Sequence, residues 1–243
     1  MSRYLSVDFK SSQLFEYSKE AKEGFEAQEG RSGFRKYFNE GITGELLNVG
    51  VRDSKIGQQI NMALKDIEGE INVIQVGLYD QKGNVDNNFA ESLISYLPSL
   101  EKGRMYRFFP YNLTAETLEE SDKKAGKELQ KKYYDKRGIS LKEGGEVSIT
   151  KLGYNKKGEK DSTKIPSLEW KKDPTGKNKP SAVSLEAKNE FLLSKLMEAV
   201  DGHLKYEGNN TTTNSTPSRA NTQTQFEPVE SSNDDYDHDD LPF

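Results

Sequence analysis

Basic and aromatic side chains lie next to one another at four places in the sequence: residues 35–38, 104–111, 154–157 and 170–172. Proteins that bind single-stranded nucleic acid combine cationic side chains for the phosphates with aromatic rings on which the bases stack. One stacked base contributes about 1–3 kcal/mol, so three or four rings are enough for useful affinity. The candidate contact residues in these segments are Arg35, Lys36, Tyr37, Phe38, Arg104, Tyr106, Arg107, Tyr154, Lys156, Lys157, Trp170 and Lys171.

Arg52 and Lys65 are further candidates for phosphate contacts because of their positions in two expected strands. Apolar and polar residues alternate in residues 42–53 and 60–66, so both cations point away from the apolar face. The residues expected to face inward are Leu47, Val49, Val51, Ile60, Met62 and Leu64, and those expected on the opposite face are Leu46, Asn48, Arg52, Asn61, Ala63 and Lys65.

The strand expected over residues 104–111 has aromatic residues on both faces. One face carries Arg104, Tyr106 and Phe108, and the other carries Met105, Arg107, Phe109 and Tyr111. Because one face must pack into the core, only the rings of the other face are free to stack on bases. The sequence leaves open which face is which.

Other chemistries find little support in the residues. The chain has no cysteine, which excludes disulfide bonds and thiolate metal sites. His203 and His238, its two histidines, belong to no metal-ligand or catalytic-triad pattern. Thr175-Gly176-Lys177 lacks the upstream glycine and the following Ser or Thr of a phosphate-binding loop. We therefore expect no enzymatic activity, no metal and no cofactor.

The expected elements are mainly strands joined by short turns. Five or so strands with one helix between them favour an OB-fold, a five-stranded, partly open barrel, within residues 40–183. Periodicity alone also allows another small β-barrel. The fold class is thus mainly β with added helices. Besides the two strands above, strands are expected over residues 71–79, 104–111, 146–152 (with Val147 and Ile149 inward) and 167–171, and a helix over residues 85–97.

Additional segments surround this expected domain. Residues 1–39 are interpreted as an N-terminal extension that packs on the barrel, and residues 114–137 as a charged helical insertion on its surface. A C-terminal helix is expected over residues 184–204, within a segment 184–206. Its N-cap is expected at Ser184, its end at Gly202, and its apolar stripe at Leu185, Leu192, Leu196 and Ala199.

Charge is unevenly distributed along the 243 residues. Residues 207–243 hold eight acidic residues and one arginine, whereas residues 1–206 hold 34 basic and 32 acidic residues. The net charge of -5 therefore belongs to the polar tail, which has too little apolar surface to fold and is expected to be disordered. No apolar run is long enough to span a membrane and no secretory signal is visible, so we expect a cytoplasmic protein with no membrane contact.

The tail ends in a segment with binding chemistry of its own. Asp239-Asp240-Leu241-Pro242-Phe243 combines an aromatic ring with a terminal carboxylate, and the proline discourages helix formation. Nearby acidic residues would steer this end toward a basic surface on a partner. The residues expected to contact that partner are Asp237, Asp239, Asp240, Leu241, Pro242 and Phe243.

This tip resembles the C-terminal tip of bacterial single-stranded-DNA-binding proteins, usually two or three Asp, an aliphatic residue, Pro and Phe. The order of β-rich body, polar tether and acidic end is also similar, most of all to phage-encoded members. The resemblance implies a protein that coats single-stranded DNA in the host bacterial cytoplasm. It also implies recruitment of replication and repair proteins (polymerase, primase, helicase or nuclease) through the tip.

Residues 1–206 show no motif-level match to the cellular family, whose folded domain is shorter and assembles as a tetramer. The longer body here is more like phage proteins that act as a monomer or dimer. Two other classes remain open. One is a single-strand annealing or RNA-binding protein, and the other is a protein-interaction module that does not bind nucleic acid.

Overall fold

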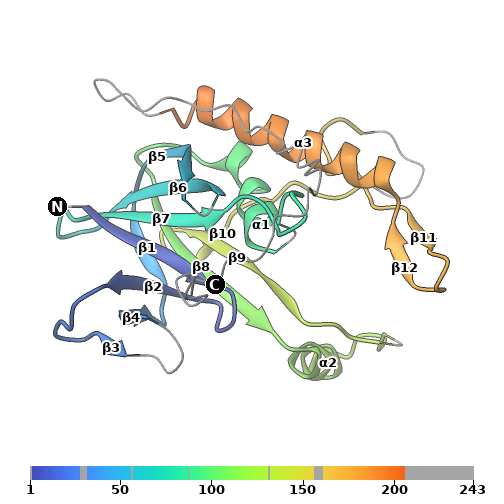
Figure 1. Cartoon of the computed structure of the whole chain (residues 1–243), viewed down its shortest axis with the longest axis horizontal. Helices are drawn as coiled ribbons and strands as arrows, with labels where there is room; N and C mark the ends of the chain where they lie inside the picture. The colour runs from blue at the N-terminus through green and yellow to red at the C-terminus, as the bar shows by residue number, and fades with distance from the viewer. Residues whose placement is uncertain are drawn as a thin grey trace, which may run out of the picture.

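The computed structural model describes residues 2–27, 32–55, 57–86, 88–130, 132–155 and 161–205, and this part of the chain is mainly β with added helices, as predicted. Ten strands form one sheet (Figure 1): β1 (Ser2–Asp8), β2 (Gln13–Ser18), β3 (Glu26–Ala27), β4 (Phe34–Phe38), β5 (Ile42–Ser54), β6 (Gly57–Lys65), β7 (Ile71–Gly77), β8 (Met105–Leu113), β9 (Lys136–Glu143) and β10 (Val147–Ser148). The remaining elements are the hairpin β11 (Trp170–Lys172) and β12 (Asn178–Pro180), the helices α1 (Phe89–Ile94), α2 (Ala115–Lys124) and α3 (Ala182–Asp201), and the 3₁₀ turn η1 (Leu97–Ser99).

The sheet is not closed into the five-stranded barrel expected from the sequence. Its strand order is β10-β9-β8-β5-β6-β7-β1-β2-β4-β3, and only β1 and β7 pair in parallel. Closing β5 to β9 into a barrel would require β7 to pair with β9, but β1 lies along that edge of β7. At β9, Ser92 of α1 accepts a hydrogen bond from the Ile139 amide (2.9 Å) and donates one to its carbonyl (3.0 Å).

The N-terminal strands extend the sheet and curve back toward its other half. β2 lies against β8, although no hydrogen bonds pair the two strands. Arg137 of β9 donates a hydrogen bond of 3.0 Å to the Phe9 carbonyl, and the ring of Phe9 contacts Phe89 of α1 edge-on. The strands β1 to β4 are therefore part of the main sheet rather than a separate layer.

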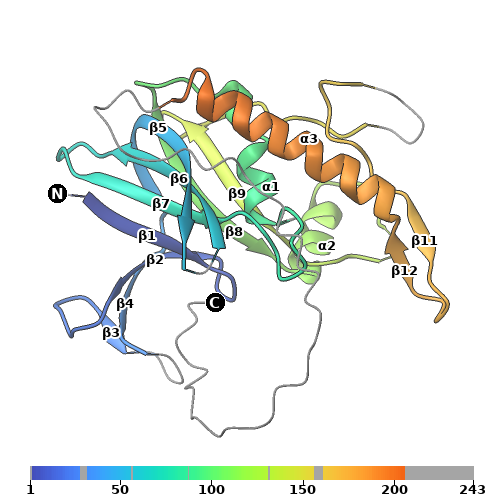
Figure 2. The same cartoon turned by 45° about the horizontal axis from the view of Figure 1, so that its top comes forward.

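The inward face of the sheet, α1 and α3 enclose one hydrophobic core (Figure 2). The prediction for β6 is confirmed, because Ile60, Met62 and Leu64 are all fully buried. Ala63, expected on the opposite face, is also buried, with 7% of its surface exposed. Lys65 is exposed as predicted.

β5 contains a bulge that the alternation pattern did not predict. Its register with β6 shifts between Leu46 and Asn48, so one extra residue enters β5 at this point. Leu46 is consequently fully buried on the same side as Val49 and Val51, while Leu47 is only half-buried. The expected positions of Leu46 and Leu47 were therefore exchanged.

The segment after β8 differs most from expectation. The helix expected over residues 114–137 ends at Lys124, and β9, which the sequence pattern did not predict, begins at Lys136 and pairs along β8. The strand expected over residues 146–152 is reduced to β10, where Val147 is 66% exposed rather than inward. The helix expected over residues 85–97 is the short α1 followed by η1.

α3 is close to its predicted position, and it packs over α1, η1 and β5 (Figures 1 and 2). Its N-cap is Ser181, whose hydroxyl accepts from the Ser184 amide, so the helix begins earlier than expected. Lys188 and Glu91 form a buried ion pair of 2.6 Å between α3 and α1. In the predicted apolar stripe of α3, the buried positions are Leu192, Leu196 and Ala199.

No helix among the described residues is long and apolar enough to cross a membrane.

Candidate nucleic-acid interface

The β11–β12 hairpin presents the only tryptophan of the chain to solvent. Trp170 begins β11 opposite Pro180, and its side chain is 62% exposed. The hairpin is an isolated strand pair, and no second layer of described residues covers this ring. The indole is therefore little desolvated when the chain folds, and one of its faces remains available to a ligand. Of the predicted stacking residues, Trp170 therefore has the most accessible ring among those that the structure describes.

The turn of this hairpin is held by one carboxylate. Asp173 accepts hydrogen bonds from the backbone amides of Thr175 and Lys177 (both 2.9 Å) and from the Thr175 hydroxyl (2.6 Å). These bonds, with the Thr175 hydroxyl first, lower the pKa of Asp173 to about 2. Gly176 supplies the positive φ of 79° that the turn requires. The hairpin is thus a defined projection and not an irregular loop.

Charge on the hairpin is strongly positive. It carries four lysines against Asp173, and Lys179 pairs with that carboxylate at 2.9 Å. Among the described residues, Lys171, Lys172 and Lys177 make no ion pair. The hairpin therefore carries one exposed indole and three lysines without an ion pair among the described residues, and single-strand binding uses this combination of ring and cations.

The base of the hairpin is fixed to the start of α3. The Ser181 amide donates to the Glu169 carbonyl (2.7 Å), and the Glu169 amide donates to the Ser184 hydroxyl (3.1 Å). The helix cap and the hairpin thus share residues. Figures 1 and 2 both show the hairpin projecting from the N-terminal end of α3.

A second polar surface covers the outer face of β5, β6 and β7. Cross-strand register places Gly50, Asn61 and Gln75 in one row, and Arg52, Gln59 and Gly77 in the next. A Cβ added at Gly50 or Gly77 would meet no atom within 4 Å, so the backbone is accessible there. Gln59 is buried, but the half-buried amides of Asn61 and Gln75 and the bare backbone offer hydrogen bonds without selecting a particular base.

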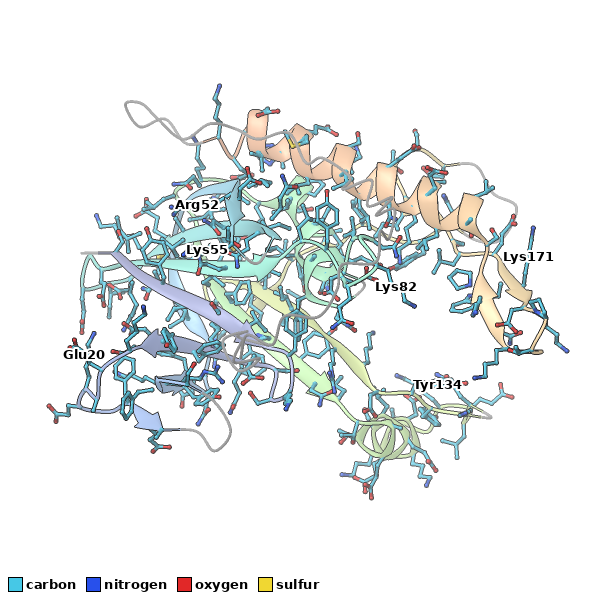
Figure 3. All side chains as sticks on the ribbon, viewed as in Figure 1. Glu20, Arg52, Lys55, Lys82, Tyr134 and Lys171 are labelled. Carbon is cyan, nitrogen blue, oxygen red and sulfur yellow. The ribbon has the colours of Figure 1, made fainter. Side chains whose placement is uncertain are left out.

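Cations line the ends of this outer face. Arg52 and Lys55 are exposed at the turn between β5 and β6, and Lys82 is exposed in the turn after β7. In the view of Figure 3, these three side chains and Lys171 of the hairpin follow one another across the molecule. Lys65 lies at the other end of β6, directly opposite Glu45.

Two predicted contact residues lie in the interior, and these predictions need correction. Arg35 is 4% exposed, with its guanidinium 4.7 Å from the centre of the Phe15 ring and 4.0 Å from Asp8. Tyr106 is 2% exposed, and its hydroxyl accepts from the Glu101 amide at 3.0 Å. Burial raises the pKa of the Tyr106 hydroxyl. The face of β8 that contains Tyr106 is therefore the core face.

The residues after Arg35 are partly engaged in the N-terminal strands. Tyr37 is half-buried and donates to Asp8 (3.1 Å), and burial raises the pKa of its hydroxyl. The ammonium of Lys36 lies 5.7 Å from the centre of the Phe38 ring, which packs against the core. These three residues belong to β4, apart from the hairpin in the views of Figures 1 and 2.

The other predicted cations and rings have mixed positions. Arg104 is exposed but pairs with Glu101 (3.3 Å) and Glu143 (3.5 Å), so its charge is largely compensated. Tyr154 is 52% exposed, and the ammonium of Lys188 lies 5.7 Å from the centre of its ring. Arg107 is half-buried on the outer face of β8. Lys156 and Lys157 lie outside the described residues, as do Asp237, Asp239, Asp240, Leu241, Pro242 and Phe243.

Sequence reasoning missed one exposed aromatic residue beside a cation. Tyr134 is 68% exposed, and the Lys132 ammonium lies 4.9 Å from the centre of its ring. The signal was present, because residues 131–134 have the same basic–aromatic pairing as the four predicted segments. These residues fall in the segment expected to be a surface helix, but α2 ends at Lys124 and leaves Tyr134 beyond it.

Within the part of the chain that the structure describes, His, Asp and Glu residues form no cluster of three that could hold a metal ion.

Comparison with known proteins gave no match. No family model, no curated protein and no solved structure is similar to this chain.

Proposed function

We propose that this chain is a sequence-independent single-stranded-DNA-binding protein that coats and protects exposed strands during replication, recombination and repair. The proposal rests mainly on Trp170, which is 62% exposed on a hairpin where three lysines make no ion pair with any described residue. A ring in this setting stacks on any base, and the lysines bind phosphates without regard to sequence. The outer face of β5–β7, with its amides and glycines, extends the same sequence-tolerant surface.

The arrangement of the strands supports this proposal. β5, β6 and β7 form a meander, α1 separates β7 from β8, and β8 pairs with β5 and β9. We propose that these five strands are an open variant of the OB-fold, in which the extra strand β1 takes the place of closure. In the OB-fold the second and third strands present the ligand face. Here these are β6 and β7, next to Arg52 and Lys55.

The acidic tail has a separate role in the proposed function, which is the recruitment of partner proteins. Residues 207–243 carry a net charge of -7 and end in the tip Asp239–Phe243, which we propose recruits replication or repair proteins. A tethered polyanion also competes with DNA phosphates for the basic surface at high effective concentration. DNA binding would then release the tip for its partner.

The test is a titration of Trp170 fluorescence with a dT oligonucleotide at two salt concentrations, alongside a gel-shift assay. We expect quenching that weakens steeply with salt, because phosphate contacts release counterions. Repeating the gel shift with an RNA oligonucleotide of matching sequence separates DNA binding from RNA binding. Absence of both quenching and a gel shift would refute the proposal and favour a protein-interaction module.

A further inference from the structure

The outer face of β8 and β9 contains a hollow of about 190 Å³ lined by Arg107, Phe109, Ser140 and Lys142. Arg107 lies directly opposite Lys142, and Phe109 directly opposite Ser140. The four side chains therefore form a two-by-two patch with two cations at one end and a ring beside a hydroxyl at the other. Pockets that enclose a whole small molecule measure roughly 300–1,000 Å³, so this hollow suits one unit of a longer chain.

The two cations occupy paired positions on adjacent strands. In the described parts of both strands, neither Arg107 nor Lys142 makes an ion pair, and the nearby Glu143 pairs with Arg104 instead. Like charges directly opposite one another destabilise an antiparallel pair. An anion bound between them would remove this repulsion, so the pair itself points to an anionic ligand.

The guanidinium of Arg107 is held in position by the backbone. Its Nε and Nη2 atoms donate hydrogen bonds of 2.9 Å and 2.7 Å to the Glu40 carbonyl. Gly41, with a φ of 75°, permits the close approach of this turn to the Phe108 carbonyl. Two of the five guanidinium N–H donors are used in this way, which leaves others for a ligand. An oriented cation loses less conformational entropy on binding than a free one.

The ring end of the hollow is partly open to solvent. Phe109 stands on the face of β8 opposite the buried Tyr106 and Phe108, and it remains partly exposed. Ser140, opposite Phe109, is half-buried. An aromatic ring thus lies next to two cations on the same face of the sheet, so one ligand unit could meet both.

We propose that this hollow is a nucleotide subsite, in which Arg107 and Lys142 bind one phosphate and Phe109 stacks on the attached base. The inference rests on the proposed binding of single-stranded DNA and adds a contact on β8–β9, separate from the β11–β12 hairpin. It assigns functions to Phe109 and Lys142, which were not among the candidate contact residues named from the sequence.

The test measures affinity for a dT oligonucleotide over a range of salt concentrations by gel shift. Phe109→Leu should weaken binding about 5- to 140-fold, the loss of one stacked base, and leave the salt dependence unchanged. Lys142→Gln should instead reduce the slope of log affinity against log salt by about 0.7. Lys123→Gln is the matched control, because Lys123 is exposed on α2 and pairs with Glu119 at 2.6 Å.

A second variant guards against loss of folding. Phe109→Trp in a Trp170→Phe background carries its only indole in the hollow, and the fluorescence of that indole should be quenched by the oligonucleotide. One set of results would refute the subsite and leave the proposed function standing. In that case the wild-type chain binds DNA, Phe109→Leu and Lys142→Gln bind DNA with the wild-type affinity and salt dependence, and the fluorescence of the indole in the hollow is not quenched. If the wild-type chain shows no gel shift, both fall together.

Discussion

Replacing Trp170 with alanine should weaken binding to single-stranded DNA and leave the fold intact. The indole is 62% exposed and faces Pro180 across the hairpin, so little buried surface is lost. Exposed positions of this kind change the free energy of unfolding by about 0.5 kcal/mol or less. Loss of one stacked base costs about 1–3 kcal/mol of binding free energy, which is about 5- to 140-fold in affinity.

The assay is a gel-shift titration with a dT oligonucleotide, accompanied by thermal unfolding of each variant. Trp170→Phe retains a ring and should recover most of the affinity, which separates stacking from a general effect of the substitution. Replacing Lys171 and Lys172 with glutamine tests charge independently, and should reduce the slope of log affinity against log salt by about 1.4. Wild-type affinity in Trp170→Ala, with an unchanged melting temperature, would contradict a stacking role for this residue.

Three further predictions concern the tail, the core and the hairpin turn. Deleting residues 234–243 should tighten DNA binding at low salt and abolish partner recruitment, whereas Phe243→Ala should abolish recruitment alone; unchanged affinity in the deletion would exclude competition by the tail. Lys188→Met leaves Glu91 as an unpaired buried charge and should lower the free energy of unfolding by about 3–5 kcal/mol in a denaturant titration. Because the pKa of Asp173 is lowered to about 2, its stabilisation of the turn should be complete above the ordinary pKa of 3.8 and disappear as the pH falls through 2, which NMR titration of its carboxyl would measure.

Local periodicity was enough to predict the elements whose burial follows a single repeat. β6 alternates strictly, and Ile60, Met62 and Leu64 are buried as expected. α3 combines a helical apolar stripe with Gly202 at its end, and only its first turn was misplaced. Each of these elements packs one face against the core, so a regular repeat of apolar residues predicts which side chains are buried there.

The remaining elements depend on long-range pairing that local patterns do not contain. The bulge between Leu46 and Asn48 is visible only in the register with β6. β9 is recognisable from its pairing with β8, since residues 136–143 begin with two cations and a glycine instead of a clean alternation. The parallel pairing of β1 with β7 joins segments almost seventy residues apart and decides that the sheet stays open.

The same limit applies to the candidate site. The exposure of Trp170 and Lys171 follows from their place in a short polar segment that has no apolar neighbour to pack with. Tyr106 and Arg107 are neighbours with the same local composition, yet β8 buries one and turns the other outward. Only the position of the core decides between the two faces of such a strand.

The bulge in β5 also makes the two ends of the outer sheet face electrostatically different. By shifting the alternation, it turns Leu46 inward and leaves Glu45 opposite Lys65 on the outer face. Arg52, at the other end, lies opposite Gln59, which carries no charge. A carboxylate beside Lys65 offsets part of its attraction for phosphate, whereas Arg52 keeps its full charge. The positive potential of this face should therefore rise toward the β5–β6 turn, where Arg52 and Lys55 lie, so a bound strand is held more tightly there than at Lys65.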